Sequence, residues 1–228
     1  KDFQGQVLHT GLWPKEPVDL SSKRVGVIGT GSSGVQAIPE LAKMAEHLYV
    51  YQRSPVYTVP ANRKAMRGEV QDEFRQNYRE IRDLQQRNFG GVANFRLTKS
   101  IKKAAPAVKQ PKRMPKLMGL SDKQRAQLVA EQGLGVLLTF SDVYSDLEAN
   151  EVANELFREG IEKIVADPAV ANGLLPRGYG LGCKRQVLDR DYYETFNNPD
   201  VTLFDLRETP IERVTPLGIQ TSGQEQCL

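Results

Sequence analysis

A short glycine-rich turn constrains this chain more than any other part of its sequence. Residues 29–34 read Gly-Thr-Gly-Ser-Ser-Gly, which fits the pattern G-x-G-x-x-G. The turn follows a compact apolar run, Val25 to Ile28, and precedes Ser33 to His47, where apolar residues recur at helical spacing. A second strand is predicted over Leu48 to Gln52. Strand, glycine turn, helix and strand form the start of a βαβ unit, so we expect an α/β fold with a parallel, Rossmann-like sheet.

Each glycine of this turn has a physical role in binding a dinucleotide. Gly29 permits the tight turn, Gly31 lets the backbone approach a pyrophosphate, and Gly34 lets the helix pack closely on the strand. The free amides and partial positive charge at the helix N-terminus favour phosphate groups. The alternative is a glycine-rich turn without a ligand, but the strand before it and the helix after it favour a dinucleotide. The predicted cofactor-binding residues are Gly29, Thr30, Gly31, Ser32, Ser33 and Gly34.

The residue at the end of the second strand indicates which dinucleotide is bound. A site for NAD places Asp or Glu there, where it binds the ribose 2′-hydroxyl. This chain has Arg53 followed by Ser54, and no acidic residue stands between Tyr49 and Pro60. A guanidinium matches a phosphate with charge-assisted hydrogen bonds, so Arg53 favours the 2′-phosphate of NADPH. The alternative is an ordinary surface arginine.

The middle of the chain is predicted to be mostly helical. Apolar residues recur at helical spacing from Val70 to Leu84, and Ser121 with Gln124 reads as a capping box. Ser145 with Glu148 is predicted to open a further helix, which Asp167-Pro168 is expected to end. We therefore expect a helical insertion over 62–180, between two parts of an NADPH-binding domain, 23–61 and 181–228.

Short elements are predicted toward the end of the chain. Tyr192 to Phe196 reads as a short helix and Val201 to Phe204 as a strand. Ile211 to Val214 and Gly218 to Thr221 are expected to form a hairpin. Residues 1–22 carry no periodic pattern and are expected to form a linker.

Composition excludes several classes of function. The chain has 31 Lys and Arg against 28 Asp and Glu, and this near balance argues against nucleic acid as a partner. A locally basic stretch, 99–116, is interpreted as a solvated crossing because prolines interrupt it. With 2 cysteines and 2 histidines the chain shows no metal-binding spacing, and no apolar run is long enough for a membrane span. We therefore expect no metal, no membrane association, and a reduced, cytoplasmic location.

The N-terminal segment carries a resemblance to a known family. Phe3, Gly5, His9, Trp13 and Pro14 match the pattern F-x-G-x-x-x-H-x-x-x-W-P, just ahead of the glycine-rich turn. This resembles the signature of Baeyer–Villiger monooxygenases, which are class B flavin-dependent monooxygenases. The likeness extends to 52–55, which resembles the stretch that grips the 2′-phosphate, and to 182–185, which resembles the segment carrying the active-site arginine.

The resemblance implies an enzyme that uses NADPH, FAD and O2 to insert one oxygen atom into a ketone, giving an ester or lactone. Arg185 is then the catalytic cation that stabilises negative charge, since it stays protonated at working pH. Lys184 would join Arg53 on the 2′-phosphate. His9 and Trp13 would have a structural or coupling role in the linker. The family's strand at the end of the NADPH domain is missing here, and position 186 is Gln where the family commonly has proline.

The first glycine-rich turn of that family, for FAD, lies upstream of the signature and is not in this sequence. We therefore expect only the NADPH-binding and helical portion of such an enzyme, inactive by itself, with an exposed sheet edge that favours self-association. Two alternatives stay open: a flavin-containing monooxygenase that oxidises nitrogen or sulfur, and a non-enzymatic NADPH-binding or redox-sensing module.

Overall fold

A computed structural model of the 228-residue chain describes residues 2–61, 68–87 and 115–228. Its contacts form two compact units, one of residues 1–61 with 115–228 and the other of residues 62–114. Residues 99–114 of the predicted basic crossing lie outside the described residues. The extent of the predicted helical insertion as a separate domain stays a prediction.

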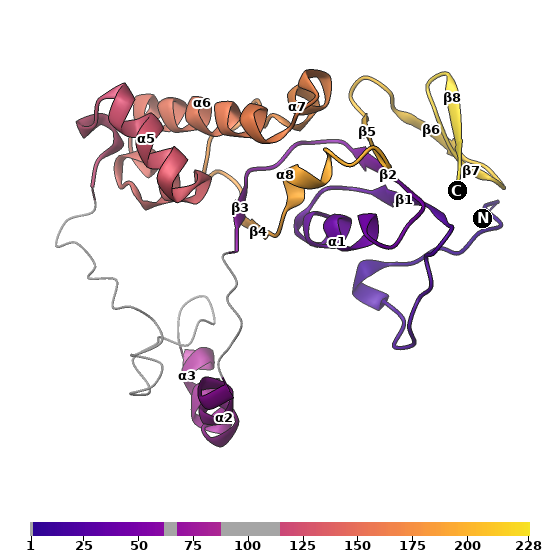
Figure 1. The fold of residues 1–228 in the computed structure, drawn as a ribbon, viewed down its shortest axis with the longest axis horizontal. Coiled ribbons are helices and arrows are strands. Elements are labelled where there is room, and N and C mark those ends of the chain that lie inside the picture. Colours follow the sequence, from indigo (N-terminus) through magenta and orange to yellow (C-terminus); the bar gives the residue numbers. More distant parts are fainter. Residues whose placement is uncertain (1, 62–67, 88–114) are drawn as a thin grey trace. The chain divides into compact units, whose positions relative to one another are not determined.

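The larger unit is built on a parallel sheet, as predicted (Figure 1). Strands β1 (Arg24–Ile28), β2 (His47–Gln52) and β5 (Val201–Asp205) lie in the order β1-β2-β5. Val27 pairs with Val50, and Val50 in turn with Leu203. The three strands of this sheet are parallel, so the residues that follow β1 and β2 emerge at the same edge of the sheet.

Helix α1 (Ser32–Ala42) connects β1 to β2 and is shorter than its apolar pattern predicts. It buries Val35 and Ile38 completely. The predicted end at His47 is wrong, because His47 begins β2 and pairs with Arg24 of β1. Its ring Nε2 lies 2.8 Å from Thr202 Oγ1 on β5. The pairing of the strands, which is a tertiary effect, therefore ends the helix before the pattern does.

The larger unit also contains the helices that follow residue 115, and their first cap agrees with the prediction. Ser121 Oγ accepts from the Gln124 amide at 3.4 Å, while Gln124 Oε1 accepts from the Ser121 amide at 2.9 Å, which completes the capping box. The elements are η3 (Leu117–Gly119), α5 (Asp122–Gln132), η4 (Leu134–Thr139), η5 (Asp142–Tyr144), α6 (Leu147–Ile164), α7 (Pro168–Leu174) and α8 (Tyr192–Thr195).

Two predicted helix boundaries are wrong, and in both cases an aspartate is the reason. Asp146, not Ser145, caps α6, since its carboxylate accepts from the Glu148 amide at 2.9 Å. Asp167 and Pro168 do not end α6 but begin α7, where Asp167 caps the helix and Pro168 occupies its first turn. Proline is well tolerated there because that residue's amide has no partner within the helix.

Shorter strands complete the larger unit. β3 (Thr58–Pro60) pairs in parallel with β4 (Val187–Asp189), a long-range contact that the sequence did not predict. The predicted hairpin is confirmed as β6 (Ile211–Val214) and β7 (Gly218–Thr221), and an unpredicted strand, β8 (Gln224–Cys227), pairs with β7.

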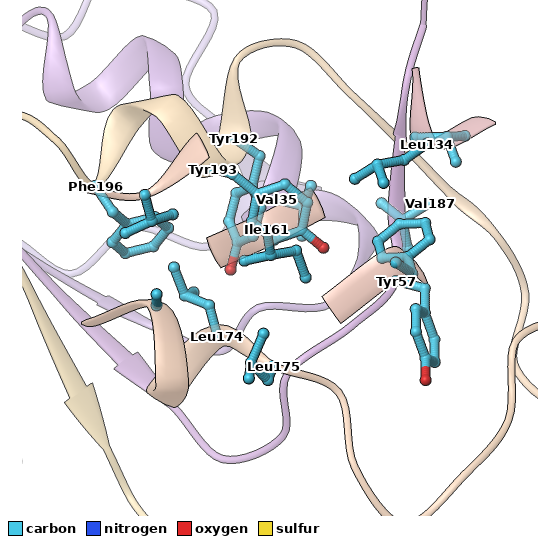
Figure 2. Packing of buried hydrophobic residues seen from close by; sticks show 14 of the residues in the cluster. Val35, Tyr57, Leu134, Ile161, Leu174, Leu175, Val187, Tyr192, Tyr193 and Phe196 are labelled. Atoms are coloured by element: carbon cyan, nitrogen blue, oxygen red, sulfur yellow. The ribbon is translucent and has the colours of Figure 1, made fainter. Parts of the chain in front are cut away.

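One hydrophobic core holds the helices and the sheet of this unit together. Figure 2 shows side chains from α1, α6, α7 and α8 pointing into it, among them Val35, Ile161, Leu174 and Tyr192. All four are at most 1% exposed. The strand–helix–strand start is therefore fixed against the later helices, which positions the loops at the sheet edge.

The smaller unit is described only over two helices, α2 (Gly68–Gln76) and α3 (Tyr78–Arg87). Ile81 is buried, whereas Tyr78 is exposed. Within the described part of the chain, no helix combines the length and the apolar character that crossing a membrane would require.

Candidate nucleotide-binding site

The glycine-rich turn follows β1 and includes the first residues of α1. Gly29 has a φ of +99°, a conformation that L side chains rarely adopt, and its amide donates to the Tyr51 carbonyl of β2 at 2.9 Å. The turn is therefore closed against the neighbouring strand, and its geometry requires a glycine at this position.

The other two glycines differ in what surrounds them. A Cβ added to Gly34 would lie 2.2 Å from the Gly29 carbonyl oxygen, so the helix can approach the turn only if this residue lacks a side chain. A Cβ added to Gly31 would meet no atom within 4 Å, and no side chain caps the helix there. Open space thus lies in front of the exposed first turn of α1, which carries Ser32 and Ser33, as an approaching pyrophosphate needs.

The structure brings the glycine-rich turn next to the loop that carries Arg53. The buried Thr30 donates through its hydroxyl to the Ser54 carbonyl at 3.2 Å. Arg53 and Ser54 are exposed and directly follow β2. The turn and the predicted 2′-phosphate residues therefore lie at one edge of the sheet, as the parallel strands dictate.

A third segment, 177–186, approaches the same loop through an aromatic side chain. The hydroxyl of Tyr179 donates to the Pro55 carbonyl at 2.7 Å, and the Lys184 ammonium lies 3.9 Å from the centroid of the Tyr179 ring. The Tyr57 hydroxyl donates to the Tyr179 carbonyl at 3.3 Å. Lys184 is thus connected to the loop that carries Arg53, although 131 positions separate them in sequence (184 − 53).

The residue after Arg185, Gln186, attaches this segment to Tyr57. Gln186 Nε2 donates to the Tyr57 carbonyl at 2.8 Å, and Gly182 has a φ of +87°. Arg185 itself is exposed. The glutamine that replaces the family's common proline therefore has a structural partner of its own.

Burial raises the pKa of two tyrosine hydroxyls in this region above the ordinary value, at which they are already protonated at neutral pH. It raises the pKa of Tyr179 to about 12, with a further contribution from Tyr57. Burial also raises the pKa of Tyr57. Both side chains therefore donate hydrogen bonds at neutral pH, as the contacts to Pro55 and Tyr179 require.

The residues of the N-terminal signature fall into two groups. His9 Nδ1 accepts from the Gly11 amide at 3.1 Å and caps the short helix η1 (Thr10–Leu12). Trp13, half exposed, lines a groove together with Ser33 of the glycine-rich turn. Pro14 is exposed beside it.

The other two signature residues lie at the start of the linker. A Cβ added to Gly5 would lie 2.4 Å from the ring of Phe3, so this glycine makes room for the aromatic side chain. The amide of Gln4, between them, donates to the Pro216 carbonyl at 3.0 Å.

Sequence reasoning missed Tyr179 and Tyr57. Tyr179 stands between Gly178 and Gly180, and no local pattern marks it as part of the site. Among the described residues, no group of three or more His, Cys, Asp or Glu is placed to hold a metal ion.

Comparison with known proteins places this geometry in context. No protein-family model matches the chain. It is 38% identical to phenazine N-monooxygenase of Lysobacter antibioticus over 96% of this chain and 38% of that protein. It is also 38% identical to a Baeyer–Villiger monooxygenase of Pseudooceanicola batsensis, over 100% of this chain and 39% of that protein.

A solved structure agrees with these relatives. OTEMO in complex with FAD and NADP superposes with a TM-score of 0.78 at 32% identity, covering 100% of this chain and 41% of that one. The chain thus spans about two fifths of the length of the proteins it matches.

The Rossmann-like parallel sheet and its glycine-rich turn thus match a portion of a protein that was solved in complex with FAD and NADP. Over 96–100% of its length, the chain is similar to Baeyer–Villiger and related monooxygenases.

Proposed function

We propose that this chain is the NADPH-binding portion of an FAD-dependent Baeyer–Villiger monooxygenase, which inserts one oxygen atom of O2 into a ketone to give an ester or lactone. One observation supports it above all: an open, glycine-lined helix start lies beside a loop that carries Arg53 and no carboxylate. The relatives at 38% identity extend this proposal from nucleotide binding to oxygen transfer.

The residues present fit the dinucleotide. The open space before Gly31 accommodates a pyrophosphate, which the amides of Ser32, Ser33 and Gly34 would bind at the helix N-terminus. Arg53, Ser54 and Lys184 would then hold the 2′-phosphate, because their segments meet at this edge through Thr30 and Tyr179. When bound, NADPH supplies a hydride and FAD supplies the site of oxygen activation.

Arg185 is proposed as the fixed cation of the active site. A guanidinium keeps its charge at any working pH, so it stabilises negative charge on oxygen without donating a proton away. Lys184 and Arg185 are adjacent, so one short segment would serve both the nucleotide and the reacting oxygen. His9, Trp13 and the remaining signature residues would couple the linker to α1, since Trp13 and Ser33 line one groove.

The nucleotide preference is tested by Arg53→Ala in the 228-residue chain, with affinities for NADPH and NADH measured by fluorescence titration. A charge-assisted hydrogen bond contributes about 1.5–3 kcal/mol, so NADPH affinity should fall about 10- to 150-fold while NADH affinity stays unchanged.

Arg24→Ala is the matched control. Arg24 is also exposed, but it begins β1 at the opposite end of the sheet, where it pairs with His47. Six positions separate His47 from Arg53 in sequence, so Arg24 lies roughly 20 Å from Arg53 by strand rise. Salt screens the interaction between exposed charges at that distance. Equal NADPH preference in Arg53→Ala and wild type would refute the assignment.

The reaction itself is tested on a full-length protein that contains this chain. Incubation with NADPH, O2 and a cyclic ketone should yield the lactone, which mass spectrometry identifies. The relative that oxidises phenazine nitrogen favours one second candidate, N-oxidation. An N-oxide from a heteroaromatic amine, with no lactone from any ketone supplied, would select that candidate. A ketone and O2 as partners, and a cytoplasmic location, stay proposals of the same kind.

A further inference from the structure

We propose that Tyr179 is a positioning residue that determines the preference for the 2′-phosphate: its ring holds the Lys184 ammonium, and its hydroxyl ties that ring to the loop of Arg53. The inference rests on the proposed binding of NADPH, and it adds a residue that carries no charge and no phosphate contact of its own. Both cations would then reach one phosphate because one side chain fixes the distance between their segments.

The geometry of Tyr179 points in two directions. On one side its ring centroid lies 3.9 Å from Lys184 Nζ. At the other end its hydroxyl donates to the Pro55 carbonyl at 2.7 Å, two residues after Arg53. The ring and the hydroxyl belong to one rigid group, so the hydrogen bond to Pro55 fixes the position of the ammonium relative to the backbone of the Arg53 loop.

Tyr179 itself is firmly held, unlike the exposed lysine that it positions. The Tyr57 ring packs edge-on against it with centroids 5.4 Å apart, and the Tyr57 hydroxyl donates to its carbonyl. Tyr57 in turn packs edge-on against the fully buried Phe157 of α6. The ring is therefore anchored in the hydrophobic core of the larger unit.

The backbone after Tyr179 is anchored to α6 as well. Asn150 Nδ2 donates to the Leu181 carbonyl at 2.9 Å, and the Leu181 amide donates to Asn154 Oδ1 at 2.8 Å. A Cβ added to Gly180 would lie 2.2 Å from Asn150 Oδ1, so the close approach depends on that glycine. The Tyr179 segment is thus attached to helix α6.

The contact with the ring leaves Lys184 able to bind an anion. A ring face attracts an ammonium without consuming its three N–H donors as a carboxylate would. The ion pairs formed by the described residues do not include Lys184. A long side chain held in this way loses less conformational freedom on binding a phosphate, so pre-organisation raises the affinity.

The test isolates the 2′-phosphate by comparing two ligands that differ only in that group, adenosine 2′,5′-bisphosphate and adenosine 5′-monophosphate. The dissociation constant of the 5′-monophosphate divided by that of the 2′,5′-bisphosphate, which measures the preference for the 2′-phosphate, is determined by calorimetry on the 228-residue chain. Tyr179→Leu should lower this ratio about three- to tenfold, the range for losing a cation–π contact, and leave 5′-monophosphate binding unchanged. Tyr179→Phe keeps the ring but loses the tie to Pro55, so it should lower the ratio by a smaller factor.

A double-mutant cycle with Lys184→Met separates positioning from general damage. If Tyr179 acts through Lys184, Tyr179→Leu should have no further effect on the ratio once Lys184 is methionine. Tyr78→Leu is the matched control, because Tyr78 is an exposed tyrosine of α3 in the other unit. It should leave the ratio unchanged.

The outcomes divide cleanly. The inference is overturned if Tyr179→Leu has the wild-type ratio, or if Tyr179→Leu lowers the ratio equally in the wild-type and the Lys184→Met background. Either result leaves the proposed binding of NADPH intact. A wild-type chain that binds both ligands equally overturns the proposed function itself. Should Tyr179→Leu fail to fold by circular dichroism, Tyr179→Phe decides: a wild-type ratio refutes the tie to Pro55, and a lowered ratio supports it.

Discussion

The same substitution should have different effects on stability at two glycines of the same turn. Gly31→Ala adds a methyl group where no atom lies within 4 Å, at a φ of −75° that alanine adopts readily. Reduced freedom of the unfolded chain would stabilise the protein by about 0.4–1 kcal/mol. The poorer capping of alanine relative to glycine costs a similar amount, several tenths of a kcal/mol, so stability should change by less than about 0.5 kcal/mol.

Gly34→Ala is different because its methyl group meets backbone. The added Cβ would lie 2.2 Å from the Gly29 carbonyl oxygen, and Cβ atoms essentially never approach closer than 3.0 Å, so helix and turn must separate by about 0.8 Å (3.0 − 2.2). Overpacking of this kind costs about 1–3 kcal/mol. At roughly 2–4 °C per kcal/mol for a chain of this size, the melting temperature should fall by about 2–12 °C.

Gly31→Ala should weaken nucleotide binding although it leaves stability nearly unchanged. Gly31→Ala should lower NADPH affinity by about tenfold or more, about 1.4 kcal/mol, because its methyl group occupies the space that the pyrophosphate needs. Thermal melts followed by circular dichroism and fluorescence titration with NADPH measure the two effects. Wild-type affinity in a well-folded Gly31→Ala chain would refute the role given to this turn, and a Gly34→Ala chain as stable as wild type would refute the packing argument.

Three further predictions concern other parts of the chain. Arg185→Ala in a full-length protein should lower oxygen transfer about 100- to 1000-fold while NADPH affinity is kept, as comparison of turnover with titration will show; equal losses in both would contradict its assignment. Burial by itself would raise the pKa of Asp142, but the backbone amides of Leu117 and Met118, which donate to it at 2.8 and 3.0 Å, outweigh burial and lower that pKa. A carboxyl whose pKa is lowered on folding stabilises the protein above its unfolded pKa of about 3.9, and this stability is lost as pH falls through the folded pKa. Asp142→Asn should therefore lower the free energy of unfolding by about 1–3 kcal/mol at pH 7 and by progressively less below about pH 4. A difference between the two proteins in urea unfolding that does not change with pH would count against this. Strand β1 lies at one edge of its sheet among the described strands, so the chain should self-associate, and a monomer by size-exclusion chromatography at all concentrations would contradict this.

The local features of this fold were predictable because their causes lie within a few residues. The strand, glycine turn and helix around residue 31 follow from apolar spacing and from glycine's freedom, and the structure confirms them. The same holds for the capping box at Ser121 and the hairpin after Ile211. The errors concerned helix boundaries. Ser145 and Asp146 are both good N-cap residues, and Asp167-Pro168 can end one helix or begin the next, so only the folded chain shows which residue caps which helix.

What the sequence determined by itself was the glycine-rich turn, the acid-free loop of Arg53, and the resemblance that directs attention to Lys184 and Arg185. Only the tertiary structure decided that Lys184 is connected to that loop. The connection runs from Tyr179 to Pro55 and Tyr57, each of which lies more than 120 residues before Tyr179 in sequence. Spacing along a chain reports periodicity within one helix or strand, whereas contacts between distant segments depend on how buried faces pack. The pairing of β3 with β4 brings those segments together, and no local pattern specifies it.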